Sequence, residues 1–525
     1  MAIHHLKGAA FACIAGAAGA FAVSTTASAA NDVLNPERAL YVDWYSSAVT
    51  HASYDLSGQD RQNALKIAGY PLAKWFTGGT PAEVQAKAAA LVADAAVDHK
   101  IPVIVAYNVP FRDCAQYSAG GAHDTAAYKA WIDGLAAGIG DSSAVVLVEP
   151  DGLGIIPHYT TINGSKEWCQ PADADPATAA ASRFEQLNYA VDRLTSLANT
   201  AVYLDGTHSA WLGVGDIADR LVKAGVQKAD GFFLNVSNYE LSSHLEKFGT
   251  WISKCIHYGT NPAEGGWRLG HFDWCASQYF PANPNDFNTW VLTDQWYADN
   301  VDNAVNPPDP ATSAHFVVDT SRNGQGPWTP PAGVYSDAQV WCNPPGRGLG
   351  DRPTTDTGNA LMDAKLWVKV PGESDGQCTR GTAGPEDPER GIADPAAGAW
   401  FKEQAAELVA LAQPALPASS CKVYYNVLAD WRGGFLSQVT IQNLTKQPVR
   451  GWTLGFAFPE NERVIEALGA NTWQRRELVK ASNERWNRVI PPKRFDGFAF
   501  YGRQSDAKHD PLLLFMLNGQ QCSTP

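Results

Sequence analysis

The chain has 525 residues, 45% of them hydrophobic and 18% charged, which is enough for a large core and more than one domain. Its formal net charge of −14 makes nucleic acids and anionic membrane surfaces unfavourable partners. The 18 Trp residues favour flat apolar contact surfaces in addition to core packing.

The first 30 residues have the pattern of an export signal. A weakly basic start around Lys7 precedes a small apolar stretch at residues 8–23, which is too short for a membrane span. Ala27-Ser28-Ala29 then fits a cleavage site. A disordered or anchored tail is the alternative. We therefore expect a secreted protein whose mature chain has no membrane segment.

Cysteine usage agrees with export. Cys13 lies in the expected signal, so eight of the nine cysteines remain, and an even number in an exported chain indicates disulfides. None lies in a CxxC motif or beside His at zinc-site spacing, so we expect no metal. The count alone leaves the connectivity open. We favour pairing of sequence neighbours: Cys114–Cys169, Cys255–Cys275, Cys342–Cys378 and Cys421–Cys522.

Strand-like apolar runs alternate with Ala-rich helical segments through most of the chain. This alternation predicts a parallel sheet with helices on its faces, and seven strands predict an incomplete α/β barrel of the TIM type. The predicted strands are residues 39–42, 101–109, 144–148, 201–204, 231–234, 315–318 and 366–370, and the predicted helices are residues 81–98, 126–138, 176–197, 216–224 and 399–411.

Acids and amides follow nearly every predicted strand. The clearest case is the apolar run at 145–148, which stops at Pro150 between Glu149 and Asp151. Asp205 and Asn235 follow the next two strands. The carboxyl ends of parallel strands meet at one face, where α/β barrels keep their chemistry. An acidic turn capping a helix is the simpler interpretation of any one acid, but a ring of them predicts a polar cleft suited to a sugar polymer.

Two stretches, residues 240–314 and 325–363, lack regular patterning and are expected to be lids or binding walls. The composition then changes after residue 412. Residues 413–420 form a short Pro/Ser/Ala-rich linker, and residues 435–442, 451–458 and 495–501 alternate like the strands of a small all-β sandwich.

The motifs in residues 35–413 resemble glycoside hydrolase family 6, the inverting cellulases. The resemblance rests first on Val148-Glu149-Pro150-Asp151-Gly152-Leu153 together with Arg112-Asp113-Cys114. It implies a distorted, incomplete α/β barrel as the catalytic domain, residues 31–412. The other matching segments, in the expected order, are 203–211, 235–239, 319–324, 341–344, 352–355 and 367–376.

Residues 421–525 resemble a family 2 cellulose-binding module. The matching motifs are Trp431 before Gly433-Gly434-Phe435, then 451–454, 486–487 and 517–522. The resemblance implies a β-sandwich with a flat row of exposed Trp side chains. Trp431 and Trp486 match two platform positions, and Leu468 stands at the third, with Trp473 five residues further on.

The resemblance also implies the chemistry of cleavage. An inverting glycosidase needs a carboxylic acid that protonates the leaving oxygen and a carboxylate that activates water, about 6.5–9.5 Å apart. Asp151 is the expected general acid, and Asp113 is expected to raise its pKa and to stabilise charge at the sugar ring. A salt bridge of Asp113 with Arg112 is the alternative. Asp375 is the candidate base, acting directly or through waters.

Further residues follow from the same resemblance. Tyr107 is expected to favour a distorted sugar ring, although a packing role is equally open, and Ser118 is expected to position the water. Glucosyl units are expected to bind through hydrogen bonds and stacking, with packing as the alternative at each position. The expected substrate-binding residues are Trp44, Asp205, His208, Trp211, Asn235, Trp341, Lys369 and Glu373.

The sequence as a whole predicts a secreted, monomeric cellulase that acts on cellulose and cello-oligosaccharides without a cofactor. The long stretch 240–314 and the segment from Cys114 to Cys169 favour a roofed site that releases cellobiose from non-reducing chain ends. An endo-β-1,4-glucanase of the same family is the second prediction. A non-catalytic glucan-binding protein is the alternative of another class, against which the acids Asp113, Asp151 and Asp375 argue.

Overall fold

The computed structural model describes residues 33–35, 37–262, 266–503 and 510–525. The expected export signal, residues 1–30, lies outside these ranges. Within them, every helix is too short or too polar to cross a bilayer.

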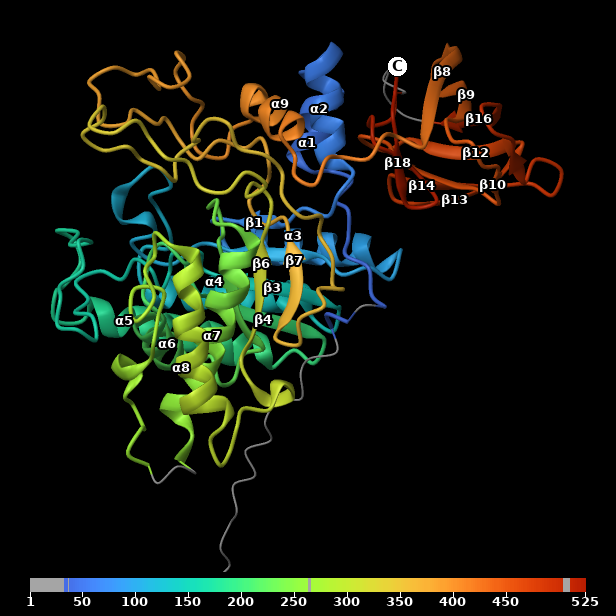
Figure 1. Ribbon diagram of the computed structural model, residues 1–525. Helices are drawn as coiled ribbons and strands as arrows, with labels where there is room; N and C mark the ends of the chain where they lie inside the picture. The colour runs from blue at the N-terminus through green and yellow to red at the C-terminus, as the bar shows by residue number, and fades with distance from the viewer. Residues whose placement is uncertain (1–32, 36, 263–265, 504–509) are drawn as a thin grey trace, which may run out of the picture.

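Seven parallel strands form one curled sheet in the order β1-β2-β3-β4-β5-β6-β7 (Figure 1). The sheet is an incomplete barrel whose two edges approach each other, because Ala73 N donates to Trp367 O (3.0 Å) and Trp75 Nε1 donates to Val368 O (2.8 Å). The predicted fold class is confirmed. The strands are β1 Lys74–Phe76, β2 Val103–Ala106, β3 Ala144–Val148, β4 Thr200–Asp205, β5 Gly231–Leu234, β6 His315–Asp319 and β7 Met362–Leu366.

Two of the predicted strands were misplaced. Residues 39–42 contribute only a single bridge, Leu40 to Ile101, and the first strand of the sheet is β1. With three residues before Gly78 and Gly79, β1 is too short to show an alternating pattern. At the other edge β7 ends at Leu366, where the predicted strand began. The apolar residues that follow it are buried without strand pairing, Val368 in the interior cluster and Trp367 and Val370 in the outer one.

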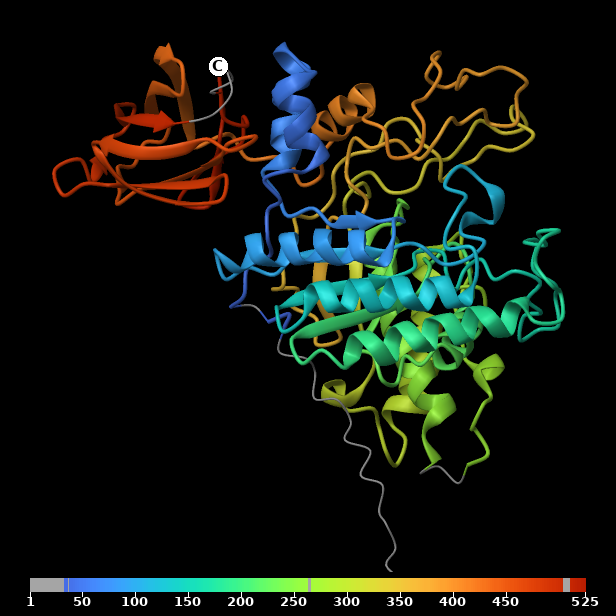
Figure 2. The same ribbon diagram turned by 180° about the vertical axis from the view of Figure 1, so that it is seen from behind.

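Helices cover the outer face of the sheet, with α3 packed against α4 and α4 against α5 (Figure 2). The prediction of an irregular stretch at 240–314 was wrong, because it contains α7 and α8. Gly, Thr and β-branched residues in α7 lower its helix propensity, so its stability comes from the buried face. The helices are α1 Ser47–Tyr54, α2 Gly58–Ala68, α3 Pro81–Ala96, α4 Thr125–Ile139, α5 Ala179–Thr195, α6 Val214–Lys223, α7 Ser242–Thr260, α8 Val291–Tyr297 and α9 Lys402–Ala410.

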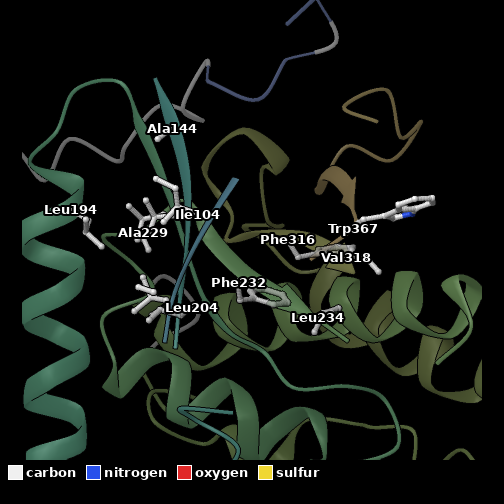
Figure 3. Close-up of a cluster of buried hydrophobic side chains, with 14 of the residues drawn as sticks. Ile104, Ala144, Leu194, Leu204, Ala229, Phe232, Leu234, Phe316, Val318 and Trp367 are labelled. Carbon is white, nitrogen blue, oxygen red and sulfur yellow. The ribbon is translucent and has the colours of Figure 1, made fainter. Parts of the chain in front are cut away.

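The strands are buried on both faces, as expected for a parallel sheet between a barrel interior and a helical layer. Alternate residues belong to two clusters. Figure 3 shows part of the outer cluster, in which Ile104, Leu204 and Phe232 meet the helical layer. The interior cluster includes Val105 and Leu147. Because successive side chains of a strand point to opposite faces, each strand contributes side chains to both the outer and the interior cluster.

The C-terminal residues form an antiparallel sandwich of a four-stranded sheet, β12-β16-β9-β8, and a five-stranded sheet, β13-β14-β11-β17-β18. Four disulfides join the cysteine pairs expected from sequence order, and Cys421–Cys522 ties the ends of this sandwich. The strands are β8 Cys421–Trp431, β9 Gly434–Asn443, β10 Val449–Arg450, β11 Thr453–Ala457, β12 Arg463–Leu468, β13 Ala470–Arg475, β14 Leu478–Asn483, β15 Val489–Ile490, β16 Phe495–Arg503, β17 Phe515–Leu517 and β18 Gln520–Cys522.

A buried Arg on α5 holds the loops at the carboxyl end of the sheet. Arg183 Nη1 donates to Gly152 O (2.7 Å) and Ile155 O (2.8 Å), and its Nη2 donates to Pro110 O (2.9 Å). Its charge also faces the fully buried Glu149, whose carboxylate accepts hydrogen bonds from the backbone of residues 108 and 109. One helix therefore fixes the loops after β2 and β3 together.

Replacing Arg183 with Met should lower the free energy of unfolding by about 3–5 kcal/mol, because it leaves three carbonyls and a buried carboxylate without their partner. Urea denaturation measures the loss. Arg193→Met, on the same helix, removes a half-exposed ion pair with Asp133 and should cost no more than about 1 kcal/mol. Equal losses in the two variants would contradict the role given to Arg183.

Candidate active site

A cavity of about 690 Å³ opens at the carboxyl end of the sheet. All three predicted catalytic acids line it, although they come from three different loops. Most of the predicted substrate-binding residues line it as well. The lining includes Trp75, Tyr107, Asp113, Ser118, Asp151, Trp168, His208, Trp211, Trp341, Lys369, Glu373 and Asp375.

Backbone strain gathers around this cavity. Asp113 has φ of 59° and Asp151 has φ of 62°, in the left-handed region that non-glycine residues rarely occupy. Glu149 (56°), Asn235 (69°) and Ser237 (62°) share that conformation at neighbouring strand ends. Such strain persists only where surrounding contacts over-determine it, and it is common at functional sites.

Asp151 is held as a neutral acid. It lines the cavity, and no hydrogen bond or ion pair of its carboxyl group is found among the described residues. Burial raises its pKa well above the usual value for aspartate, and the negative charges of Asp205 and Asp113 raise it further. A carboxyl group that keeps its proton near neutral pH can donate it to a leaving oxygen.

Asp113 lies in the same cavity and is only weakly compensated. Burial raises its pKa to about 6, although the hydrogen bond from Ser118 N (2.6 Å) and the charge of Arg112 lower it. Arg112 does not form the alternative salt bridge. Its guanidinium donates instead to the carbonyl oxygens of Ser118 (2.8 Å) and Tyr107 (2.6 Å). Asp113 therefore remains available as a like charge near Asp151.

Asp375, in contrast to Asp151, is held in the ionised form. Burial alone would raise its pKa, but the charges of Arg322 and Lys369 outweigh that effect and lower it. Its Oδ2 accepts from Arg322 Nη1 (2.8 Å), Asn343 N (3.0 Å) and Tyr239 Oη (3.2 Å). Only Oδ1, 3.4 Å from Lys369 Nζ, keeps capacity for a water. One cavity thus holds a carboxyl group that favours the neutral form and one that favours the ionised form.

The sequence did not single out Asn343 as a supporting residue. Its backbone N–H donates to Asp375, Asp375 N donates back to Asn343 Oδ1 (2.9 Å), and Gln404 Nε2 donates to the same oxygen (2.9 Å). Its Nδ2 donates to Asp394 Oδ2 (2.8 Å). The disulfide Cys342–Cys378 closes this turn on both sides. The Asn343-Pro344 motif was the sequence signal that could have identified Asn343 as a supporting residue.

His208 is neutral under ordinary conditions, because burial lowers its pKa to about 4. Its Nδ1 lies 3.3 Å from Ala210 N and accepts that hydrogen bond, so the ring proton is assigned to Nε2, which can donate to a sugar hydroxyl. Trp211 follows on the same turn with its ring 5.8 Å from the imidazole. A Cβ at Gly154 would lie 2.4 Å from Trp211 Cη2, so only glycine allows this ring position.

Two loops that line the cavity contact each other. Gln339 Nε2 donates to Tyr117 Oη (3.2 Å), and the ring of Tyr117 lies 5.8 Å from that of Trp341. A Cβ at Gly376 would lie 2.5 Å from Tyr117 Cβ, so the two walls are in close contact. Tyr117 belongs to the loop stapled by Cys114–Cys169, and Trp341 to the loop stapled by Cys342–Cys378. The two walls of the cavity are therefore joined at this contact.

The remaining wall residues are positioned by neighbours. Lys369 Nζ donates to Ser374 O (3.0 Å), and Glu373 Oε1 accepts from Ser47 Oγ (2.5 Å). Tyr107 is buried at the floor of the cavity, and Trp75 packs edge-on against it with 5.4 Å between ring centroids. Trp75 was missed because it lies on the three-residue strand β1.

Three predicted sugar contacts are corrected by their surroundings. Asp205 is buried and accepts from Leu153 N (3.1 Å) and Gly154 N (3.0 Å), so it holds the loop of Asp151. Asn235 is buried and donates to Asp319 O (2.9 Å), so it links two strand ends. Trp44 packs against the C-terminal sandwich at Gly455 and does not line the cavity. A strand-end position alone does not separate a ligand contact from a structural clamp.

The predicted platform of the C-terminal sandwich is partly corrected. Trp431 and Leu468 belong to the four-stranded sheet and are 46% and 79% exposed, and Trp486 is 74% exposed. Trp473 lies on β13 of the other sheet, paired with Lys480, which forms an ion pair with Asp98 of the barrel. It therefore faces the barrel side and is not part of that platform.

One group of possible metal ligands is committed to structural bonds. Among the described residues, Cys378, Asp387 and Asp394 offer ligand atoms within 4.8 Å of one another. The sulfur of Cys378 is bonded to Cys342, and Asp387 forms a buried ion pair with Arg380 (2.6 Å). This donor set does not fit a cation.

Comparison with known proteins agrees with this geometry. Endoglucanase A of Thermobispora bispora is 30% identical over 521 residues, covering 93% of this chain and 94% of the relative. A probable 1,4-beta-D-glucan cellobiohydrolase C of Aspergillus terreus is 31% identical over 337 residues, covering 59% of each chain. The solved structure of the endoglucanase Cel6 from Mycobacterium tuberculosis, in complex with a thio-cello-oligosaccharide, is 31% identical with a TM-score of 0.50, covering 71% of this chain and 97% of that one.

Two family models account for almost the whole described chain. Glycosyl hydrolases family 6 matches residues 35–412, which contain the barrel and its cavity. Cellulose binding domain matches residues 421–522, which form the sandwich. The chain therefore belongs to family 6 of the glycosyl hydrolases and carries a C-terminal cellulose-binding domain.

Proposed function

We propose that this cellulase cleaves β-1,4-glucosidic bonds with inversion at the anomeric carbon. Asp151 protonates the leaving oxygen, and the ionised Asp375 accepts a proton from the attacking water through its free Oδ1. The pairing of a raised and a lowered pKa in one cavity supports these roles. Asp113 keeps Asp151 protonated, while Tyr107 and Ser118 line the reaction position. Trp75, His208, Trp211, Trp341, Lys369 and Glu373 bind the glucosyl units.

The mode of attack that we propose is release of cellobiose from non-reducing chain ends. The contact of Tyr117 with Gln339 and Trp341 carries this proposal, because a bridge over the cavity hinders lateral entry of an internal stretch of glucan. A chain end can thread beneath the bridge.

Endoglucanase activity is the second candidate. The relative that spans nearly the full chain and the solved structure of similar fold both carry that name. A bridge made of one hydrogen bond and ring contacts could open to admit an internal segment.

We also infer that the protein works outside the cell as a monomer. Four disulfides require an oxidising compartment, and the signal-like start of the sequence provides the route. The exposed platform of Trp431, Leu468 and Trp486 then holds the enzyme on its solid substrate.

Asp151→Asn should lower kcat on cellotetraose by about 10²- to 10⁴-fold, because the leaving oxygen loses its proton donor. The loss should be much smaller on 2,4-dinitrophenyl β-cellobioside, whose leaving group needs no proton. Cellulose binding should not change. Proton NMR of the parent enzyme should show the α-anomer first. Asp141→Asn, an exposed position, is the control. Unchanged turnover in Asp151→Asn would favour a non-catalytic glucan-binding protein.

Asp113→Asn should move the alkaline limb of the kcat/KM profile to lower pH. Asp151 acts while protonated, so activity falls as pH rises through its raised pKa. Above about pH 6 Asp113 is ionised and holds that pKa up, and the Asn variant lacks this charge. The acid limb should stay in place, because Asp375 remains ionised at low pH. A limb that moves the other way would refute the like-charge coupling.

Tyr117→Ala should convert the enzyme toward internal attack by removing the bridge. Filter-paper hydrolysis should then leave a larger share of new reducing ends on the solid, and carboxymethylcellulose should lose viscosity faster. Tyr54→Ala removes a 54% exposed Tyr on α1 and serves as the control. If the parent enzyme already thins carboxymethylcellulose rapidly and leaves most new ends on the solid, the endoglucanase candidate replaces the chain-end proposal.

A further inference from the structure

We propose that the cellulose-binding domain is a docked, rigid part of the catalytic domain rather than a module on a flexible tether. The docking surface is the outer face of the sheet β13-β14-β11-β17-β18. Its partner is the barrel surface formed by Trp44, helices α1 and α2 and the end of α3. Figure 1 shows the sandwich beside α1 and α2.

Part of the outer face of the five-stranded sheet is buried against the barrel, while its inner face forms the sandwich core. Along β11, Leu454 and Phe456 point into the sandwich core, whereas Ala457 belongs to the main cluster of the barrel. On β14 and β17 the same alternation gives Leu478 and Met516 to the barrel cluster. A module that worked alone would present polar residues on this outer face. The apolar patch of Ala457, Leu478 and Met516 on this outer face is therefore suited to a partner.

Trp44 is the centre of the contact on the barrel side. Its side chain is 5% exposed, and a Cβ at Gly455 would lie 3.1 Å from Trp44 Cη2. Glycine at this position lets the indole approach the strand closely. This contact also gives Trp44 a structural role, since its side chain does not reach the sugar cavity.

Polar contacts surround the apolar centre. Asp94 and Asp98, at the end of α3 and just beyond it, pair with Arg476 (3.5 Å) and Lys480. Ser53 Oγ accepts from Leu513 N (3.0 Å). Further hydrogen bonds run from Gln521 Nε2 to Leu65 O and from Gln62 Nε2 to Thr524 O (3.4 Å). An apolar centre with a polar rim is the usual anatomy of a specific interface.

The linker is packed as well. Gln413 N donates to Leu349 O (2.8 Å), and Arg352 Nη2 donates to Pro414 O (2.5 Å). Leu416 packs against the main barrel cluster. A tether that permits independent motion is a free coil. Here the first half of the connection is held by the barrel at residues 413, 414 and 416, and Ser419 and Ser420 bond to the sandwich.

Docking determines which way the platform faces. Trp431 stacks on Tyr501 (5.6 Å, 5°), and Leu468 is paired with Ala499 two residues earlier on β16. These side chains share the outer face of the four-stranded sheet, opposite the docked sheet. Cellulose therefore binds on the side of the sandwich turned away from the barrel, at a set orientation to the cleft.

The test uses charge reversal in the full chain. Arg476→Glu with Lys480→Glu places like charges opposite Asp94 and Asp98 and should undock the sandwich. Scanning calorimetry should then split one unfolding transition into two, and small-angle scattering should show a larger radius of gyration. Adding Asp94→Lys and Asp98→Lys should restore the parent behaviour. Lys446→Glu with Arg450→Glu, at exposed sites of the same sandwich, makes the same charge change and should leave both readouts unaltered.

Retained cellulose binding by the reversed variant shows that the sandwich is still folded. If it fails to fold, Ser53→Trp inserts a wedge from the barrel side without changing the sandwich, and the same two readouts apply. Two transitions and an extended particle in the parent enzyme would overturn the proposal, as would a reversed variant identical to the parent. Neither readout involves substrate, so the result is independent of the proposed catalytic roles.

Discussion

Two carboxyl groups of opposite protonation state must share one cavity, and much of the surrounding structure serves that constraint. Burial alone favours the neutral form of both Asp151 and Asp375. The chain separates them by charge: Asp151 faces other acids, whereas Asp375 is held by Arg322 and Lys369. The same burial that makes an unpaired acid costly thus suits Asp151 to the proposed role of proton donor, with Asp375 as the proposed proton acceptor in the same cavity.

The constraint extends outward through residues that never reach the cavity. The buried carboxylates of Glu149 and Asp205 accept hydrogen bonds from backbone N–H groups of the loops that carry Asp113 and Asp151. Arg183 ties the same loops to α5. Left-handed backbone at the strand ends is tolerated because these clamps over-determine it. Glu149 and Asp205, which follow strands as the proposed catalytic acids do, instead hold the loops of Asp113 and Asp151 in place.

The cellulose-binding domain adds a second level of organisation. Its core, centred on residues such as Phe456 and Val479, is buried between its own two sheets. The apolar residues on the outer face of one sheet are buried by the barrel. Trp44 and Gly455 meet there at van der Waals distance. The same sandwich that exposes Trp431 to solvent on one side therefore carries an apolar patch on the other, which packs against the catalytic domain.

The sequence by itself determined most of the strands of the parallel barrel, the all-β character of the C-terminal domain and the acids that follow the strands, because alternation and strand-end chemistry are local properties. It did not reveal β1, which is too short to show an alternating pattern, or α7, which forms through tertiary packing despite residues of low helix propensity. Only the tertiary structure decided that Asp205 is a clamp, that Trp44 belongs to a domain interface and that Tyr117 bridges the cleft. Each of these roles depends on which distant atom lies within hydrogen-bonding or packing distance, and that information is absent from any single stretch of chain.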